Sequence, residues 1–214
     1  MKSKKSKEYL KLIENNKEWA ATVVKEDPEF FSRLSNTQKP DFLWIGCSDS
    51  RVPADRITGT QPGEIFVHRN IANMVTNNDL SAMSVINYAI TQLKVKHIVI
   101  CGHYNCGGVQ SAMQSSDLGI LNPWLRNIRD VYRIHQEELN NIEDEDDRFK
   151  KLVEFNVQEQ CVNIIKTPEV QRALKSKEVT VSGWVFDLQT GVLIDLKIDF
   201  DNILEHIMEI YHIV

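Results

Sequence analysis

Short, unbroken apolar runs constrain the fold of this chain more than any other feature. The runs at residues 42–47, 64–67 and 97–102 lack the polar residue at every second position that a strand with one wet face carries. Strands of this kind are buried on both faces, as in parallel sheets covered by helices. Helical periodicity lies between and after these runs, over residues 78–93, 107–113, 122–139 and 152–165. The alternation predicts an α/β domain with a central, mainly parallel β-sheet flanked by helices.

The two ends of the chain depart from this alternation. Residues 1–39 predict a helical arm that is interrupted at Asp27 and Pro28, and its apolar face either packs on a partner subunit or covers its own core. Near the other end, residues 179–186 and 192–198 surround a turn and predict a β-hairpin, followed by a short helix over 202–213. We expect one domain, residues 1–214, made of the arm and an α/β core over residues 40–214.

Composition excludes several classes of protein. The 214 residues include 25 Lys and Arg against 30 Asp and Glu, a net charge of −5, which disfavours binding to nucleic acid. The basic residues between Lys2 and Lys7 have no apolar segment behind them, so we expect no signal peptide, and no window predicts a membrane span. The four cysteines are too few and too scattered for a disulfide framework. We therefore expect a cytoplasmic protein whose cysteines are free thiols or metal ligands.

Reactive side chains follow two of the apolar runs. Cys47, with Asp49 and Arg51, comes at the end of the first run, and His103 and Cys106 follow the third. Ligands bind outside the carboxyl ends of strands in open α/β sheets, so neighbouring strands would bring these residues together. Two thiolates and an imidazole suit Zn²⁺ and leave a fourth position for water, whose pKa the metal lowers to about 7. The sequence predicts a catalytic zinc site.

Asp49 and Arg51 form a pair beside this site. As a surface ion pair they would contribute little stability. Next to a metal, Arg51 can hold the carboxylate through two hydrogen bonds while Asp49 accepts a proton from the zinc-bound water. If Arg51 releases it, Asp49 becomes a conditional fourth zinc ligand in a closed form of the site.

The remaining cysteines and histidines receive no catalytic role. Cys101 lies in an apolar strand and Cys161 on an apolar helical face, so both are expected to be buried small side chains. His97 begins a strand and is expected to be a boundary residue whose hydrogen bonds are satisfied. The helical segments carry His135, His206 and His212, which have no acidic or thiol partner in register.

Several segments resemble the β-class carbonic anhydrases. They are Cys47–Arg51, Pro62–Glu64, Phe66–Asn73, His103–Gly108 and Gly183–Val185. The resemblance implies a parallel-sheet core and one zinc per chain on Cys47, His103 and Cys106. It also implies reversible hydration of CO₂ to bicarbonate and a proton through zinc-bound hydroxide, by a homodimer or homotetramer.

The same resemblance assigns further residues to the substrate. Phe66 and Tyr88 match positions that line an apolar CO₂ pocket across the subunit interface, and the backbone N–H at Gly107 is available to a substrate oxygen. For Phe66 the alternative is an ordinary residue of the strand core.

One bacterial subgroup of the family suggests regulation. Its non-catalytic bicarbonate pocket consists of a Trp, an Arg and a Tyr; Trp44 and Arg69 match the first two, and Phe186 replaces the Tyr. Phenylalanine has no hydroxyl to donate, so we expect a pH-dependent open–closed switch but weak bicarbonate inhibition. The alternative is that Trp44 and Phe186 pack in the core.

Three other functions stay open at this point. The same scaffold could hydrolyse a CO₂-like substrate such as carbon disulfide. The chain could instead be a non-enzymatic zinc-binding protein, although that function does not need Asp49 and Arg51. Thiol chemistry at Cys47 would be sensitive to alkylation and insensitive to a chelator.

Overall fold

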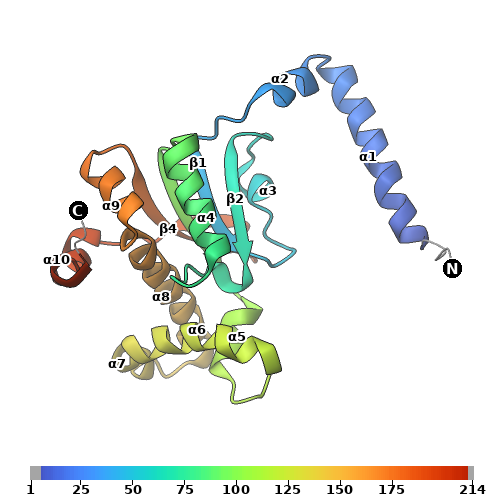
Figure 1. Ribbon diagram of the computed structural model, residues 1–214. Helices are drawn as coiled ribbons and strands as arrows, with labels where there is room; N and C mark the ends of the chain where they lie inside the picture. The colour runs from blue at the N-terminus through green and yellow to red at the C-terminus, as the bar shows by residue number, and fades with distance from the viewer. Residues whose placement is uncertain (1–5, 212–214) are drawn as a thin grey trace. The chain divides into compact units, whose positions relative to one another are not determined.

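The computed structural model describes residues 6–211, apart from the side chains at positions 202 and 204–208. Two compact units are present, Met1–Gln38 and Lys39–Val214, and Figure 1 labels their elements. Among the described residues, no helix combines the length and the apolar character needed to cross a bilayer.

The first unit is helical, as the sequence predicts. α1 (Lys7–Glu26) begins after Ser6, whose hydroxyl accepts a hydrogen bond from the Tyr9 N–H at 3.3 Å, and α2 (Phe30–Asn36) follows the predicted break. The Trp19 ring lies edge-on to Phe30 and Phe31, with centroids 6.5 and 5.6 Å away. All of α1 belongs to the described part of the chain, and none of its residues is buried.

The second unit is built on a five-stranded sheet in the order β2-β1-β3-β4-β5. The strands are β1 (Phe42–Cys47), β2 (Ile65–Asn70), β3 (His97–His103), β4 (Thr180–Asp187) and β5 (Val192–Asp195). The first four are parallel, and β5 pairs antiparallel with β4, which confirms both the mainly parallel sheet and the hairpin. Leu43, Ile45 and Ile100 are completely buried, as the unbroken apolar runs predict.

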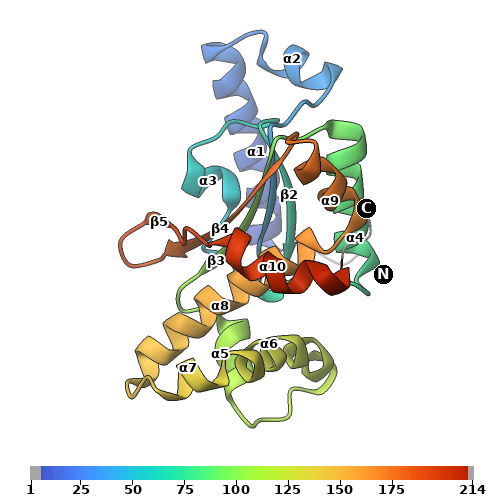
Figure 2. The ribbon, with the colours of Figure 1, turned by 90° about the vertical axis from the view of Figure 1, so that its left-hand side faces the viewer.

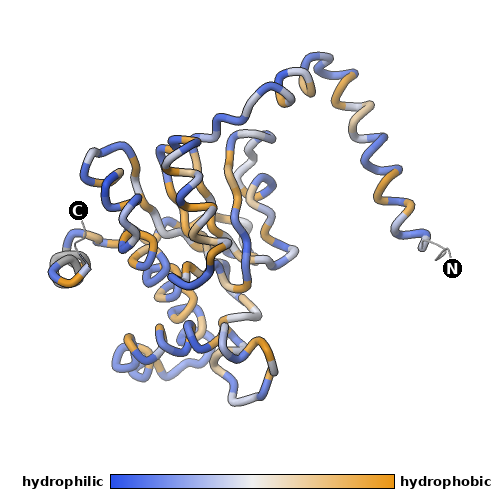
Figure 3. Tube along the Cα trace, in the orientation of Figure 1, coloured by the Kyte–Doolittle hydropathy of each residue, from blue (hydrophilic) through white to orange (hydrophobic). Residues whose placement is uncertain are grey.

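Helices cover both faces of this sheet. The helices of this unit are α3 (Ala54–Thr58), α4 (Leu80–Tyr88), α5 (Gly107–Met113), α6 (Asn122–Ile134), α7 (Gln136–Asn140), α8 (Glu145–Ile165), α9 (Pro168–Lys175) and α10 (Phe200–Tyr211), with short helical segments η1 (Ile71–Asn73), η2 (Ala89–Leu93) and η3 (Gly119–Leu121). In Figure 2, which shows the sheet nearly edge-on, α4 and α9 lie on one face and α3 on the other. The hydropathy colouring of Figure 3 shows apolar segments concentrated along the strands.

Several predicted boundaries are wrong by a few residues or more. The helix predicted over 122–139 is two helices, because the backbone leaves the helical region at His135 (φ −103°, ψ 22°). Asn122 is the first residue of α6, and Leu121 is its N-cap. The acidic stretch before Leu152 is the first turn of α8, capped by Asp144 and stabilised by negative charge at a helix N-terminus.

Differences at the end of the chain are smaller. β5 stops at Asp195, before the predicted 198, and α10 begins at Phe200, two residues earlier than predicted. The last residues of the predicted helix, 212 and 213, lie outside the described residues. α3 and α9 were not predicted, since each is too short to show a clear helical period.

Two glycines allow α8 to lie close against the sheet. A Cβ at Gly102 on β3 would lie 2.6 Å from Cγ2 of Val157, and one at Gly183 on β4 would lie 3.0 Å from Cγ1 of the same valine. Valine is stiff about its χ1 bond, so it cannot turn out of the way. The packing of α8 on the sheet therefore requires glycine, with no side chain, at positions 102 and 183.

We expect Gly102→Ala to destabilise the fold by about 1–3 kcal/mol, because the added methyl group forces α8 or Val157 to move. Thermal and urea unfolding will measure the change. Gly107→Ala is the matched control, since a Cβ there meets nothing within 4 Å. Equal stability of the two variants would contradict the close packing.

Candidate metal centre

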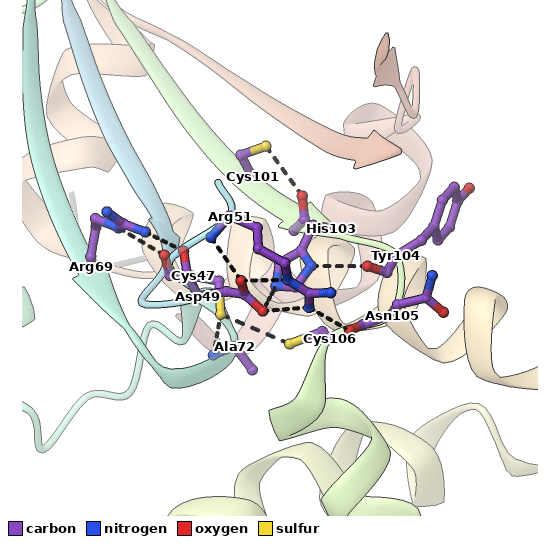
Figure 4. Close-up of polar contacts among 11 residues, drawn as sticks. Cys47, Asp49, Arg51, Arg69, Ala72, Cys101, His103, Tyr104, Asn105 and Cys106 are labelled. Atoms are coloured by element: carbon purple, nitrogen blue, oxygen red, sulfur yellow. Dashed lines mark hydrogen bonds and ion pairs between the residues drawn. The ribbon is translucent and has the colours of Figure 1, made fainter. Parts of the chain in front are cut away.

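Three metal-ligating side chains meet where β1 and β3 end. Cys47 is the last residue of β1, His103 is the last residue of β3, and Cys106 is the N-cap of α5. β1 and β3 are neighbours in the sheet, with Gly46 opposite Cys101, so both strands end at the same edge. One ligand atom from each of the three residues lies within 4.8 Å of the others, and the two sulfur atoms are 3.9 Å apart (Figure 4). The convergence expected from the sequence is present.

The imidazole of His103 is arranged as a metal ligand. Its Nδ1 donates a hydrogen bond to the backbone carbonyl of Tyr104 at 2.9 Å, which leaves the lone pair on Nε2. Nε2 is buried and has no hydrogen-bond partner among the described residues. An orphaned buried nitrogen is costly, and a carbonyl on the opposite ring nitrogen is the usual support of a metal-bound histidine. The donor set of two sulfurs and one nitrogen fits a borderline-soft divalent metal.

The two thiols are electrostatically coupled. The hydrogen bond from Cys106, helped by His103, lowers the pKa of Cys47 to about 4. The adjacent Cys47 sulfur and burial raise the pKa of Cys106. The backbone N–H of Ala72 also donates to Cys47 Sγ at 3.4 Å. A bound cation is the element that would let both sulfurs be thiolates at once.

Asp49 and Arg51 lie beside the three ligands as a bidentate pair. Arg51 Nε and Nη2 donate to the two carboxylate oxygens of Asp49 at 2.9 and 2.7 Å, and the Arg51 backbone N–H adds a third bond at 3.0 Å. These bonds hold the pKa of the Asp49 carboxyl well below its usual range. Asp49 Oδ2 is 3.7 Å from His103 Nε2. The Asp49 side chain is only 17% exposed against 54% for Arg51, so the pair differs from an ordinary surface ion pair.

Comparisons with known proteins agree with this geometry. The family model for carbonic anhydrases matches residues 42–193. A carbonic anhydrase of Emericella nidulans is 59% identical over 204 residues, which cover 95% of this chain and 90% of that protein. The chain belongs to the carbonic anhydrase family. It is therefore an enzyme of this type.

Solved structures place the chain in the β class of carbonic anhydrases. A β-carbonic anhydrase from Sordaria macrospora, one of two described as tetrameric, has a TM-score of 0.87 and 39% identity, covering 90% of this chain and 98% of that chain. One from Aspergillus fumigatus has a TM-score of 0.89 and 38% identity, covering 95% and 98%.

The residues that the β-class resemblance assigns to substrate lie in two places. Gly107 opens α5, directly after Cys106. Phe66 on β2 and Tyr88 at the end of α4 are in contact, with ring centroids 5.8 Å apart. Phe66 is four residues before Asn70, which is opposite Cys47, so it lies about 13 Å along the strand from the metal ligands of its own chain. Within one chain, the structure does not bring Phe66 to the carbonic anhydrase centre.

The candidates for a regulatory bicarbonate pocket share one face of the sheet. Register puts Trp44, Arg69 and Phe186 on the same side, and the indoles of Trp44 and Trp184 lie edge to face at 6.1 Å. Arg69 donates to the carbonyls of Cys47 at 2.8 Å and Asp49 at 2.6 Å, so its guanidinium already holds the loop of the centre. Trp44 and Phe186 are buried, as their alternative interpretation as core residues predicts.

Sequence reasoning missed several supporting contacts. Neither the loop-holding role of Arg69 nor the N–H of Ala72 on Cys47 was predicted, because both depend on tertiary placement. His135 was expected to have no acidic partner, but its Nε2 lies 3.0 Å from Glu159 on α8, since the break after α6 turns its ring toward that helix. His97, the first residue of β3, is satisfied as expected, with its Nδ1 2.9 Å from Thr180 Oγ1.

Of the other cysteines and histidines, Cys101 and Cys161 are buried as predicted, and burial raises the pKa of both thiols. His212 and the side chain of His206 lie outside the described residues.

The ligand set predicts the metal content of cysteine and histidine variants. Replacing Cys47, His103 or Cys106 by Ala should remove the bound metal, because three protein ligands are the usual minimum of a catalytic site. Cys161→Ala is the matched control, since it deletes an equally buried thiol outside the cluster and should retain about one metal per chain. Elemental analysis of the purified proteins measures this, and stoichiometric metal in Cys106→Ala would refute the assignment.

Proposed function

We propose that this protein catalyses the reversible hydration of CO₂ to bicarbonate and a proton with one Zn²⁺ per chain, held by Cys47, His103 and Cys106. The observation that carries the proposal is the sheltered Asp49 carboxylate, held by Arg51 and lying beside an unpartnered buried imidazole nitrogen. A site that only binds metal has no need of this pair. Membership of the carbonic anhydrase family supports the same reaction.

Each residue contributes a defined part of the chemistry. Zinc bound at this site would acidify a water molecule at its open position so that a nucleophile is available near neutral pH. Asp49, held in place by Arg51, would accept a hydrogen bond from that nucleophile and so orient it toward CO₂. Arg51 keeps the carboxylate in this acceptor position, and the release of the pair makes Asp49 a conditional fourth ligand. The backbone N–H of Gly107 is a donor for a substrate oxygen.

We also propose that the active form is a homodimer or homotetramer. Phe66 lies too far along β2 to reach the ligands of its own chain, and Tyr88, whose ring contacts it, is 45% exposed. A second subunit would cover this pair and place it beside the neighbouring centre, where it would hold CO₂ in an apolar pocket. The tetrameric relative from Sordaria macrospora supports such an assembly.

Stopped-flow CO₂ hydration tests the proposed function. The zinc-loaded protein should hydrate CO₂, lose this activity after prolonged chelation, and regain it with zinc. Hydrolysis of carbon disulfide without CO₂ hydration would show that the substrate is wrong. Activity that survives metal removal but not thiol alkylation would show instead that Cys47 acts as a nucleophile.

In the same assay, Asp49→Ala should retain zinc and lower kcat on the order of 100-fold, since the nucleophile loses its positioned hydrogen-bond acceptor. Arg51→Ala should also impair turnover, because it frees Asp49 to occupy the open metal position. Arg33→Ala is the control, as Arg33 makes a comparable bidentate pair with Asp27 on the helical arm. A crystal structure of Arg51→Ala with Asp49 still turned away from zinc would contradict this role.

For regulation, we propose that Trp44 and Arg69 bind bicarbonate weakly because Phe186 offers no hydroxyl. A hydrogen bond to a charged ligand contributes roughly 1.5–3 kcal/mol, or about 10- to 150-fold in affinity. Phe186→Tyr should therefore strengthen inhibition by at least about 10-fold in bicarbonate titrations at fixed pH. Phe149→Tyr, which adds a hydroxyl to a partly buried ring at the start of α8, is the control. Equal, strong inhibition of the wild-type and Phe186→Tyr proteins would show that the hydroxyl is dispensable.

A further inference from the structure

Three amide side chains form a stripe along α8. Asn156, Gln160 and Asn163 are spaced by four and three residues, so they project from the same side of the helix. Asn156 and Gln160 are each only 1% exposed, in a helix whose neighbouring buried residues are mostly apolar. Buried amides are costly unless their hydrogen bonds are made, so their partners indicate what they do.

All three amides bond to one short segment that follows β2. Asn156 Nδ2 donates to the carbonyl of Ala72 at 2.9 Å, Gln160 Oε1 accepts from the N–H of Val75 at 2.8 Å, and Asn163 Nδ2 donates to the carbonyl of Val75 at 3.1 Å. They also bond to one another, with Gln160 Nε2 to Asn156 Oδ1 at 3.2 Å and Asn163 Nδ2 to Gln160 Oε1 at 3.3 Å. We call Asn156, Gln160 and Asn163 the amide ladder.

The segment held by the amide ladder has an unusual backbone. Ala72 (φ 63°) and Asn73 (φ 49°) are consecutive non-glycine residues in the left-handed region. Such residues persist only where their surroundings determine the conformation. Asn70 fixes the same turn from the other side, since its side chain both donates to the carbonyl and accepts from the N–H of Met74 at 2.7 Å.

This backbone conformation directs one N–H group at the metal centre. The N–H of Ala72 donates to Cys47 Sγ at 3.4 Å, while the carbonyl of the same residue is the acceptor for Asn156. Ala72 alone therefore connects α8 to the sulfur ligand, through its carbonyl on one side and its N–H on the other. A donor on a thiolate fixes the orientation of the sulfur and stabilises its charge, as other supports of metal ligands do.

We propose that the amide ladder is a positioning device for the metal centre, in which Asn156, Gln160 and Asn163 hold the left-handed turn that places the Ala72 N–H on the Cys47 thiolate. The proposal rests on the proposed zinc site. It gives positioning roles to three residues of α8 that do not touch the ligands.

Zinc release from the purified holoenzyme tests this inference. Asn156→Leu and Gln160→Leu keep the approximate size of each side chain and remove its hydrogen bonds, and both should lose zinc to a chromogenic chelator about 10- to 100-fold faster than the wild-type protein. Asn163→Ala removes only the half-buried amide at the end of the ladder. It should accelerate zinc release less than the other two variants do, and it should leave the protein folded. Gln171→Leu is the matched control, because Gln171 is another buried glutamine, on α9, which donates to the carbonyls of Lys166 and Tyr211.

A second readout separates positioning from general destabilisation. In the Co²⁺-substituted proteins, loss of the N–H donor raises the energy of the thiolate electrons, so the sulfur-to-cobalt charge-transfer band of the ladder variants should move to longer wavelength. Gln171→Leu should lower the melting temperature without moving this band or the zinc release rate.

Wild-type zinc release and an unshifted band in all three ladder variants would overturn the inference while leaving the proposed function intact. A wild-type protein that binds no zinc would overturn the proposed function itself, and the inference with it. If Gln171→Leu released zinc as fast as Gln160→Leu does, the amides would act only through the stability of the fold, which would also overturn the inference.

Discussion

The parallel pairing of β1 with β3 is the constraint on which the metal centre depends. Cys47 and Cys106 are 59 residues apart in the chain, yet their sulfur atoms approach to 3.9 Å. Two neighbouring parallel strands end at the same edge of a sheet, so the hydrogen-bond register that aligns Gly46 with Cys101 also sets the separation of the residues that follow. The apolar side chains of both strands stabilise that register, since a shift of one residue would turn buried side chains to the opposite face.

Much of the fold and the ligand set could be predicted because the relevant signals are local. The unbroken apolar runs of β1 and β3 indicate buried strands, and Cys47, His103 and Cys106 follow those runs directly. Helix boundaries were harder, since they depend on capping and on tertiary contacts. The break at His135, for example, interrupts an otherwise continuous helical period and places the ring against Phe155, with centroids 3.9 Å apart.

The supporting contacts of the centre could not be predicted from the sequence. Nothing in the residue type of Ala72 indicates a left-handed backbone, which in other proteins is most often adopted by glycine. Arg69 was predicted only as an anion-binding residue, and the bonds of its guanidinium to the carbonyls of Cys47 and Asp49 were not predicted. In both cases the decisive information is which distant segment packs nearby, and a single sequence does not contain it in readable form.

The close approach of α8 to Gly102 and Gly183 has a consequence for how this protein loses its structure. The helix that packs on the two glycines through Val157 also bonds to the Ala72–Val75 segment through its amides. The same helix, α8, therefore provides both the apolar packing on the sheet and the hydrogen bonds that fix the ligand geometry. When α8 separates from the sheet, the hydrogen bonds that support the sulfur ligand are lost with it. Metal retention therefore reports the contact between α8 and the sheet.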